Sequence, residues 1–317
     1  MNTTERVILE QFAYWQGGLE RDIPPAAADA FVFVGCGTSY YIAQTLAAAF
    51  NLNGRRAIAA PGGEWTYRHK VYLSDLSGAE VVAISRSGES TEAVSALTVS
   101  RKLGLATTAI TCAEDSSVAK AADRMIFAPT HPDEGIVMTA SASLMLMMGL
   151  RWAGETVEPR VIAAARAGLE AMAGKAPALV AGRSKFVTLG SGAYYGVACE
   201  GALKLQEMSI SVSQPFHAME YRHGPISLAD RDMAAIVLYG EDAPEEDAKI
   251  VAELQAKGVA VIGLGGPGDL TLPTTTHGLQ RTLEMLPALQ ILGERIAIAK
   301  RIDSTAPRNL TKVVRLG

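Results

Sequence analysis

The sequence predicts an α/β protein built from two similar halves. An apolar run, a G-x-G and a tyrosine occur in FVFVGCGTSYY (31–41) and return in FVTLGSGAYYG (186–196), at a constant offset of 155 residues. Each copy is a short β-branched or aromatic run that ends in glycines and precedes a stretch of helical periodicity rich in Ala and Leu, which predicts strand, turn and helix. Strands that alternate with helices predict, in each half, a parallel sheet covered on both faces.

Further strand-like runs continue this alternation along the chain. They are residues 81–85, 107–111 and 125–127 in the first half, and 233–239 and 259–264 in the second. The segment 158–175, rich in Ala, Arg and Glu and followed by Pro177, predicts a helix that joins the halves. The predicted division is an N-terminal helix (1–22), a first domain (23–157), a linker helix (158–176) and a second domain that includes the C-terminal tail (177–317).

Composition excludes several classes of protein. Hydrophobic residues make up 49% and charged residues 20%, which is typical of a chain with a large core. A net charge of -4 and the lack of a basic run give nucleic acid nothing to bind. No apolar stretch reaches the roughly 20 residues that span a bilayer, and the acidic N-terminus lacks a secretory core. We therefore expect no membrane partner, no nucleic-acid partner and a cytoplasmic location.

Cysteine and histidine are too sparse and too dispersed to suggest a metal site. Cys36, Cys112 and Cys199 are widely spaced and odd in number, which fits neither a disulfide framework nor zinc. The five histidines include no pair at a metal-ligand spacing. We expect no metal and no cofactor.

Two loops of the first half predict an anion site. GCGTS (35–39) and SRSGES (85–90) each lie between a strand and a helix, where glycines permit tight turns and the first amides of a helix face outward. Helix capping uses the same residue types, so one such loop is equally compatible with a structural role. Two loops can converge on one ligand, and neither has the pattern of a nucleotide triphosphate or dinucleotide site. A monophosphate bound by hydroxyl groups is the better ligand.

The second half carries candidates for proton transfer. Glu200, Lys204 and Glu207 lie at i, i+4 and i+7 on one face of a predicted helix, where they would serve either solubility or catalysis. His223 precedes Gly-Pro in EYRHGP, so its ring projects from a turn and can exchange protons near neutral pH. The second repeat has GSGAYY and LYGED where the first has its hydroxyl-rich loops, and the acids would repel phosphate. One phosphate site per chain is expected.

Together GCGTS, SRSGES and CEGALKLQEMS (199–209) resemble the SIS (sugar isomerase) domain family, over residues 31–312. The branch concerned contains the isomerase half of glucosamine-6-phosphate synthase and the free-standing deaminases. The resemblance implies two tandem SIS domains, each a flavodoxin-like sandwich that binds no nucleotide.

The resemblance also implies roles for individual residues. Glu207 would move the proton between C1 and C2, His223 would open the sugar ring, and Lys204 would stabilise negative charge on the sugar oxygens. His223 would reach the site of a neighbouring subunit, which implies a homodimer. The phosphorylated, amino-sugar ligand would contact the two loops and the C-terminal tail, at Cys36, Gly37, Thr38, Ser39, Ser85, Arg86, Ser87, Ser90, Thr311 and Lys312; Cys36 would contribute backbone and packing.

Departures from the synthase pattern guide the choice of reaction. Ala140 and Arg222 stand where the synthase has lysine, and no glutaminase segment with a leading cysteine precedes the repeat. The leading expectation is therefore an isomerising deaminase that converts glucosamine 6-phosphate and water to fructose 6-phosphate and ammonia. The alternatives are another phosphosugar isomerase, a fructosamine-phosphate deglycase, an ammonia-using synthase, and a sugar-phosphate sensor without turnover. The presence of Glu207, Lys204 and His223 argues against a sensor.

Overall fold

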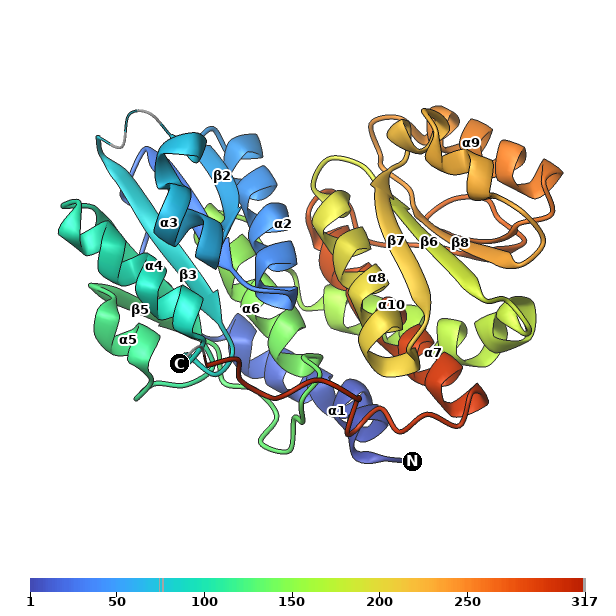
Figure 1. Ribbon diagram of the computed structural model, residues 1–317, viewed down its shortest axis with the longest axis horizontal. Helices are drawn as coiled ribbons and strands as arrows, with labels where there is room; N and C mark the ends of the chain where they lie inside the picture. The colour runs from blue at the N-terminus through green and yellow to red at the C-terminus, as the bar shows by residue number, and fades with distance from the viewer. Residues whose placement is uncertain (74, 76, 316–317) are drawn as a thin grey trace. The chain divides into compact units, whose positions relative to one another are not determined.

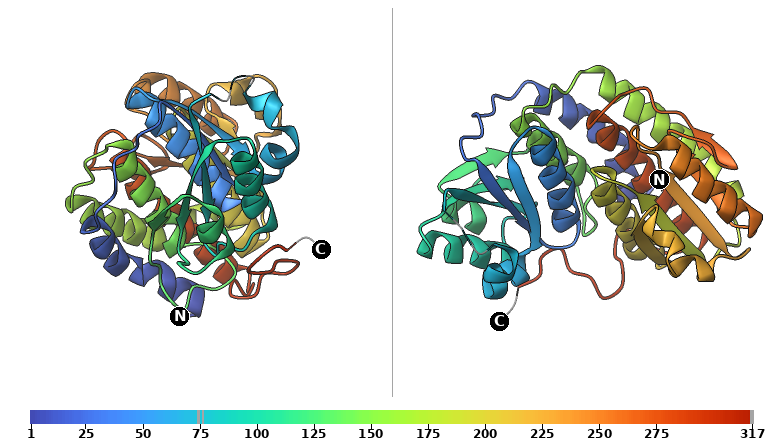
Figure 2. Two further views of the ribbon diagram at one scale, coloured as in Figure 1. Left: turned by 90° about the vertical axis from the view of Figure 1, so that its left-hand side faces the viewer. Right: turned by 90° about the horizontal axis from the view of Figure 1, so that it is seen from above.

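The computed structural model describes residues 1–73, 75 and 77–315. By internal contacts the chain divides into two compact units. The first-half unit contains Leu9–Val157 and the chain from Asn309 onward; the second-half unit contains Met1–Ile8 and Glu158–Arg308. The division predicted from the sequence placed the C-terminal tail with the second half, whereas its contacts are with the first. Figures 1 and 2 show the red part of the tail running beside the helices of the first-half unit.

Each unit contains one five-stranded sheet in which every neighbouring pair is parallel. The first sheet has the order β2-β1-β3-β4-β5 and the second β10-β9-β8-β6-β7. Numbered from its own first strand, each half therefore has the order 2-1-3-4-5, which is flavodoxin-like. The strands are β1 (Ala30–Gly35), β2 (Arg56–Pro61), β3 (Ala79–Ser85), β4 (Ala106–Thr111), β5 (Arg124–Phe127), β6 (Lys185–Gly190), β7 (Val212–His217), β8 (Met233–Leu238), β9 (Ala260–Leu264) and β10 (Leu270–Leu272).

Helices cover both faces of the first sheet, as the alternation of side chains along β1 shows. Phe31 and Phe33 contact Phe50 and Trp152 on one face, while Val32 and Val34 belong to a cluster with residues of α3, α4 and α5 on the other. The helices of this unit (Figure 1) are most of α1 (Thr3–Leu19), and α2 (Thr38–Leu52), α3 (Gly62–Tyr72), α4 (Thr91–Lys102), α5 (Ser117–Ala121) and α6 (Ala140–Ala153).

The second sheet is also covered on both faces. Val187 and Leu189 of β6 pack with Ile250 and Leu254 of α9 on one face. On the other face α8 lies against β6 and β7, and α10 packs against α7 and α8. The elements are α7 (Arg160–Val180), α8 (Tyr194–Ser209), α9 (Pro244–Ala256), α10 (Gln280–Ala299) and the short 3-10 helices η1 (Glu220–Arg222) and η2 (Pro225–Leu228).

The structure corrects two sequence predictions. The helix expected over 158–175 begins at Arg160 and continues through Pro177 to Val180, because extensive packing against α10 offsets the hydrogen bond that a proline removes. The strands β2, β7 and β10 were not predicted. All three lie at sheet edges, where burial is incomplete and a residue such as Pro215 is tolerated within β7.

Among the described residues, no helix is both long enough and apolar enough to cross a bilayer.

Candidate functional site

The two predicted phosphate loops follow neighbouring strands. From β1 the chain moves outward to β2, and from β3 it moves to β4 on the other side. The gap between β1 and β3 is therefore the point at which the winding of the sheet reverses, where ligands of open parallel sheets bind. The structure brings GCGTS and SRSGES to the carboxyl edge of one sheet, at this point.

Backbone geometry shapes the first loop. A Cβ on Gly35 would lie 2.5 Å from the carbonyl carbon of Ser39, and Gly37 has a φ of 54°, so glycine is required at both places. Thr38 and Ser39 begin α2 and are each 4% exposed. Their hydroxyl groups therefore lie at the positive end of a helix, as an anion site needs.

Serine side chains hold the second loop in shape. Ser85 Oγ accepts a hydrogen bond from the Gly88 amide at 3.1 Å, and Ser87 Oγ accepts one from the Glu89 amide at 3.2 Å. A hydroxyl that accepts still has its own proton to donate. Ser90 precedes α4 without capping it through its side chain. Ser87 and Ser90 therefore retain hydroxyl donors for a ligand.

The turn between β2 and α3 packs against both loops. A Cβ on Gly62 would lie 3.3 Å from Cys36 Sγ and 3.3 Å from Cβ of Glu92, in the first turn of α4. Burial, with a smaller effect of the Glu92 carboxylate, raises the pKa of the Cys36 thiol to about 11, although the Gly62 amide acts in the opposite direction. A thiol that stays protonated is a poor nucleophile at neutral pH.

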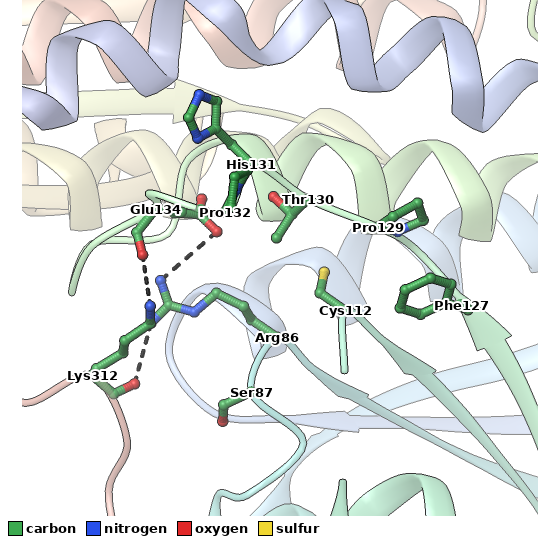
Figure 3. A pocket seen from close by; sticks show the side chains of 10 residues that line it. All are labelled: Arg86, Ser87, Cys112, Phe127, Pro129, Thr130, His131, Pro132, Glu134 and Lys312. Atoms are coloured by element: carbon green, nitrogen blue, oxygen red, sulfur yellow. Dashed lines mark hydrogen bonds and ion pairs between the residues drawn. The ribbon is translucent and has the colours of Figure 1, made fainter. Parts of the chain in front are cut away.

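Beside the second loop lies a cavity of about 330 Å³, shown in Figure 3. Its walls come from the carboxyl ends of β3, β4 and β5, from the segment before α6, and from the tail. Lys312 Nζ donates to the Glu134 carbonyl at 2.7 Å, and Arg86 contacts the same two residues. The lining residues are Arg86, Ser87, Cys112, Phe127, Pro129, Thr130, His131, Pro132, Glu134 and Lys312.

Not every predicted ligand of this group faces the cavity. Thr311 is exposed, and its hydroxyl donates to the Val313 carbonyl at 3.1 Å. The sequence analysis assigned no role to Glu134. Its carboxylate accepts hydrogen bonds from the amides at the start of α6. Glu134 Oε1 accepts from the amides of Thr139 at 2.6 Å and Ser141 at 3.0 Å. A carboxylate six residues before the start of α6 was the available signal.

The charged face of α8 is buried. Lys204 is fully buried; its Nζ lies 3.3 Å from Glu200 Oε1 and donates to Glu207 Oε2. Burial alone would lower the pKa of Lys204, but the two carboxylates outweigh it and the pKa is raised. The side chain therefore stays a cation at neutral pH. Because ion pairs serving solubility lie on the surface, the solubility interpretation of this helix is wrong.

Two glycines let α8 and α10 approach closely enough to enclose Lys204. A Cβ on Gly201 would lie 2.9 Å from Leu289, and one on Gly293 would lie 3.1 Å from the Lys204 carbonyl oxygen. Glu207, at the end of α8, has a side chain that is 20% exposed. The cluster thus combines a buried cation with one carboxylate that reaches solvent.

His223 ends the 3-10 helix η1 and is exposed. Its amide donates to the Glu220 carbonyl at 3.0 Å, which fixes the turn predicted from Gly-Pro. No hydrogen bond or ion pair of its imidazole to another described residue is recorded in the structure. Arg222 beside it pairs with Glu253, with Nη2 at 3.0 Å from Oε1.

The second half has the same reversal point, between β6 and β8, but its loops are occupied by their own side chains. Glu241, from the LYGED segment, accepts from the Gly278 amide at 2.6 Å and lies 2.9 Å from His277 Nδ1. After β6, Tyr195 stacks on His217 with ring centroids 3.7 Å apart. Sequence analysis missed His217, since it ends an unpredicted edge strand. Among the described residues, no three His, Cys, Asp or Glu gather as metal ligands.

Residues 26–151 and 180–277 match the family model of the SIS domain. The chain belongs to the SIS domain family. The predicted family and the predicted pair of tandem SIS domains are therefore confirmed, with one domain in each half.

Curated relatives of this SIS chain are longer proteins. It is 29% identical over 317 residues to the isomerising glutamine–fructose-6-phosphate aminotransferase of Pyrobaculum aerophilum, with 91% of the chain and 52% of the relative covered. The relative of the same name from Caulobacter vibrioides is 30% identical, with 92% and 53% covered. The SIS chain thus spans about half the length of these relatives, which are enzymes, in agreement with the prediction of an enzyme.

Solved structures include relatives of the same length as this SIS chain. The structure of glucosamine-6-phosphate deaminase from Thermotoga maritima has a TM-score of 0.83 and 27% identity, and covers 99% of this chain and 100% of its own. The tagatose-6-phosphate ketose/aldose isomerase of Escherichia coli has a TM-score of 0.80 at 22% identity, with 94% and 93% covered. The similarity to the Escherichia coli isomerase shows that the two chains share a fold.

Proposed function

We propose that this chain is a phosphosugar aldose-ketose isomerase, and specifically the isomerising deaminase that converts glucosamine 6-phosphate and water to fructose 6-phosphate and ammonia. The observation that carries the proposal is the buried Glu200–Lys204–Glu207 cluster in a chain whose other half has two hydroxyl-rich loops at a ligand-binding edge. The Thermotoga maritima structure, named as this deaminase and matched over its whole length, supports the choice of reaction.

In the proposed reaction the first half binds the phosphate. The hydroxyl groups of Thr38, Ser39, Ser87 and Ser90 donate to its oxygens, with support from the positive ends of α2 and α4. Neutral donors suit a phosphate that must leave again as part of the product, because they bind less tightly than a cluster of arginines would.

The second half supplies the proton chemistry. His223 exchanges a proton with the ring oxygen as the sugar opens. Glu207 removes the proton from C2, which forms an enolamine, and returns it to C1; the resulting imine at C2 is hydrolysed by water and releases ammonia. The Lys204 ammonium stabilises negative charge on the C1 oxygen while the proton is in transit. The raised pKa of Lys204 keeps that charge in place at neutral pH.

Ammonia release from glucosamine 6-phosphate tests the reaction directly. Purified protein should release ammonia and fructose 6-phosphate in equal amounts when no glutamine is present. Glu207→Gln protein, purified by the same procedure, serves as the control for contaminating activity. Formation of glucosamine 6-phosphate from fructose 6-phosphate and ammonium, with no net forward reaction, would favour the synthase instead. Thermal stabilisation by glucosamine 6-phosphate without turnover would contradict the deaminase proposal and favour a sensor.

We further propose a homodimer in which His223 acts in the neighbouring subunit's site. His223 lies directly after η1, and its imidazole is exposed and has no hydrogen bond or ion pair among the described residues, which supports this role. Glu207→Gln and His223→Ala chains, each inactive alone, should recover part of the wild-type activity when mixed under conditions of subunit exchange. If native mass spectrometry shows that heterodimers form and activity stays at the level of the separate variants, the site uses His223 of its own chain.

A cytoplasmic location belongs to the same proposal, because phosphorylated sugars are intracellular metabolites. Cell fractionation with an antibody against the chain would test it. Recovery in the membrane or secreted fraction would contradict it.

A further inference from the structure

We propose that Arg86 is a positioning residue rather than a phosphate ligand: it fastens the C-terminal tail and the segment before α6 to the phosphate loop, and thereby holds Lys312 at that loop. The kinetic part of this inference depends on the function proposed above. The structural part does not.

Backbone carbonyls already accept hydrogen bonds from three of the five donors of the Arg86 guanidinium. Nη1 donates to the Gly135 carbonyl at 2.8 Å and faces Glu134 Oε2 at 3.9 Å, while Nη2 donates to the carbonyls of Ile136 at 2.9 Å and Lys312 at 3.2 Å. Three of the four Nη hydrogens thus have a carbonyl acceptor, and the fourth faces the Glu134 carboxylate at ion-pair distance without a hydrogen bond. The fifth donor, Nε, is buried away from solvent and has no hydrogen-bond partner among the described residues. The five donors of Arg86 are therefore bonded to carbonyls, turned toward Glu134 or buried, which suits a role in holding these segments together.

Arg86 is also the counter-ion of a buried carboxylate. The Glu134 side chain is 2% exposed; its Oε1 accepts the amides at the start of α6, and its Oε2 has no hydrogen bond among the described residues. The guanidinium at 3.9 Å from Oε2 offsets this buried charge. A phosphate at Arg86 would compete with Glu134 for the same cation, whereas carbonyl oxygens do not.

The bond to Lys312 links the tail to the loop. Beyond it, the Val314 carbonyl accepts the Thr91 amide at 3.4 Å, and Arg315 lies 3.5 Å from Glu89. The first of these hydrogen bonds is long, and the second pair is weakened by solvent because the Arg315 side chain is 70% exposed. Arg86 is 8% exposed, so its bond to the tail is shielded from water and is the stronger attachment.

Lys312 is held through its carbonyl group and through its ammonium group. Its carbonyl accepts from Arg86, and its Nζ donates to the Glu134 carbonyl at 2.7 Å, so the same two residues bind the main chain and the side chain of the tail (Figure 3). An ammonium has three donors, and two of them remain for a ligand in the cavity that Ser87 also lines. A lysine at position 86 would retain the charge but lack the planar fork that reaches three carbonyls.

The first test measures the tail without substrate. Arg86→Gln and Arg86→Lys should increase hydrogen exchange of the Thr91 amide, which donates to the Val314 carbonyl of the tail, by at least tenfold, with an unchanged core of the first-half unit. Arg101→Gln is the matched control, because Arg101 also contacts a carboxylate and a carbonyl in this unit but lies at the surface. Arg86→Lys keeps the counter-ion of Glu134, so it remains informative if Arg86→Gln fails to fold. Wild-type exchange of the Thr91 amide in a folded Arg86 variant would overturn the proposal.

The second test asks whether Arg86 acts through Lys312. Lys312→Ala and Arg86→Gln should each reduce kcat/KM. The kcat/KM of the double variant should lie within about twofold of that of the less active single variant, because both substitutions remove the ammonium of Lys312 from its position. Losses that multiply would identify Arg86 as an independent substrate ligand and overturn the proposal. A wild-type protein without turnover would contradict the proposed function alone, since the exchange measurements would still decide the role of Arg86.

Discussion

The two helices that follow the first strand of each half, α2 and α8, occupy equivalent places in one fold but carry opposite chemistry. In α2 the buried hydroxyls Thr38 and Ser39 lie at the start, and the sequence TSYYIAQTLAAAFNL has no charged residue. In α8 the start is Tyr194, and charges lie further along at Glu200, Lys204 and Glu207. With the offset of 155 residues, buried Ala49 corresponds to buried Lys204.

This difference indicates how a duplicated fold divides its work. The start of a helix carries a positive field, so α2 is suited to an anion, while the middle of a buried helix has a low dielectric environment that strengthens charge interactions, so α8 is suited to acid-base chemistry. The loops show the same division. The first half has hydroxyls at its reversal point, whereas in the second half Glu241 binds its own partners there.

The largest expected effect is on catalysis by α8. Glu207→Gln should lower kcat by two to four orders of magnitude, as loss of a general base does, and change KM by less than threefold, since the proposed phosphate ligands lie in the other half. Steady-state kinetics with glucosamine 6-phosphate measures both. Glu246→Gln, on the exposed pair with Lys249, is the control. A rise in KM equal to the fall in kcat would mean that Glu207 binds substrate, and the division between the helices would not hold.

The stability of the buried cluster gives the next effect. Lys204→Met leaves Glu200 and Glu207 without their cation and should destabilise the protein by about 3–5 kcal/mol, measured by urea denaturation. Adding Glu200→Gln and Glu207→Gln to Lys204→Met should recover most of that loss, since the uncompensated charges are removed. No recovery would locate the defect in packing and not in charge.

The pH dependence of this effect has a definite sign. The folded pKa of Lys204 is raised above that of the unfolded chain, so its contribution is fully present below about pH 10 and is lost as the pH rises through the folded value. The difference in stability between wild type and Lys204→Met should therefore be constant from pH 7 to 9.

A moderate effect distinguishes the phosphate loops of the two halves. Ser87→Ala and Thr38→Ala should each raise KM by about 10- to 150-fold, the equivalent of a charge-assisted hydrogen bond of roughly 1.5–3 kcal/mol. Ser191→Ala, at the place in the second repeat that corresponds to Cys36, should leave KM unchanged. Inhibition by inorganic phosphate should follow the same order. An equal rise in KM for Ser191→Ala would show that both halves bind phosphate.

The parts of this molecule that could be predicted from sequence are those fixed by local patterns. Buried central strands, glycine turns and the i, i+4, i+7 face of α8 each have a short-range signal, and β1, β3 and α8 lie where the pattern indicates. The edge strands lack such a signal because their burial is incomplete. The role of Arg86 could not be predicted because its hydrogen-bond partners lie 49, 50 and 226 residues away, and only the folded chain shows that three of its donors bond to carbonyls.

The smallest expected effect concerns position 36, where the first repeat has cysteine and the second has Ser191. With burial raising the pKa of Cys36 to about 11, about one thiol in a thousand is ionised at pH 8. Alkylation of Cys36 by iodoacetamide at pH 8, followed by mass spectrometry, should be at least 100-fold slower than that of free cysteine and should accelerate as the pH rises toward 11. Cys36→Ser, which makes the loop resemble the second repeat, should change kcat/KM by less than threefold, because the loop needs a small side chain there and not a nucleophile. Rapid alkylation together with loss of activity in Cys36→Ser would give the thiol a chemical role and make the first half catalytic as well.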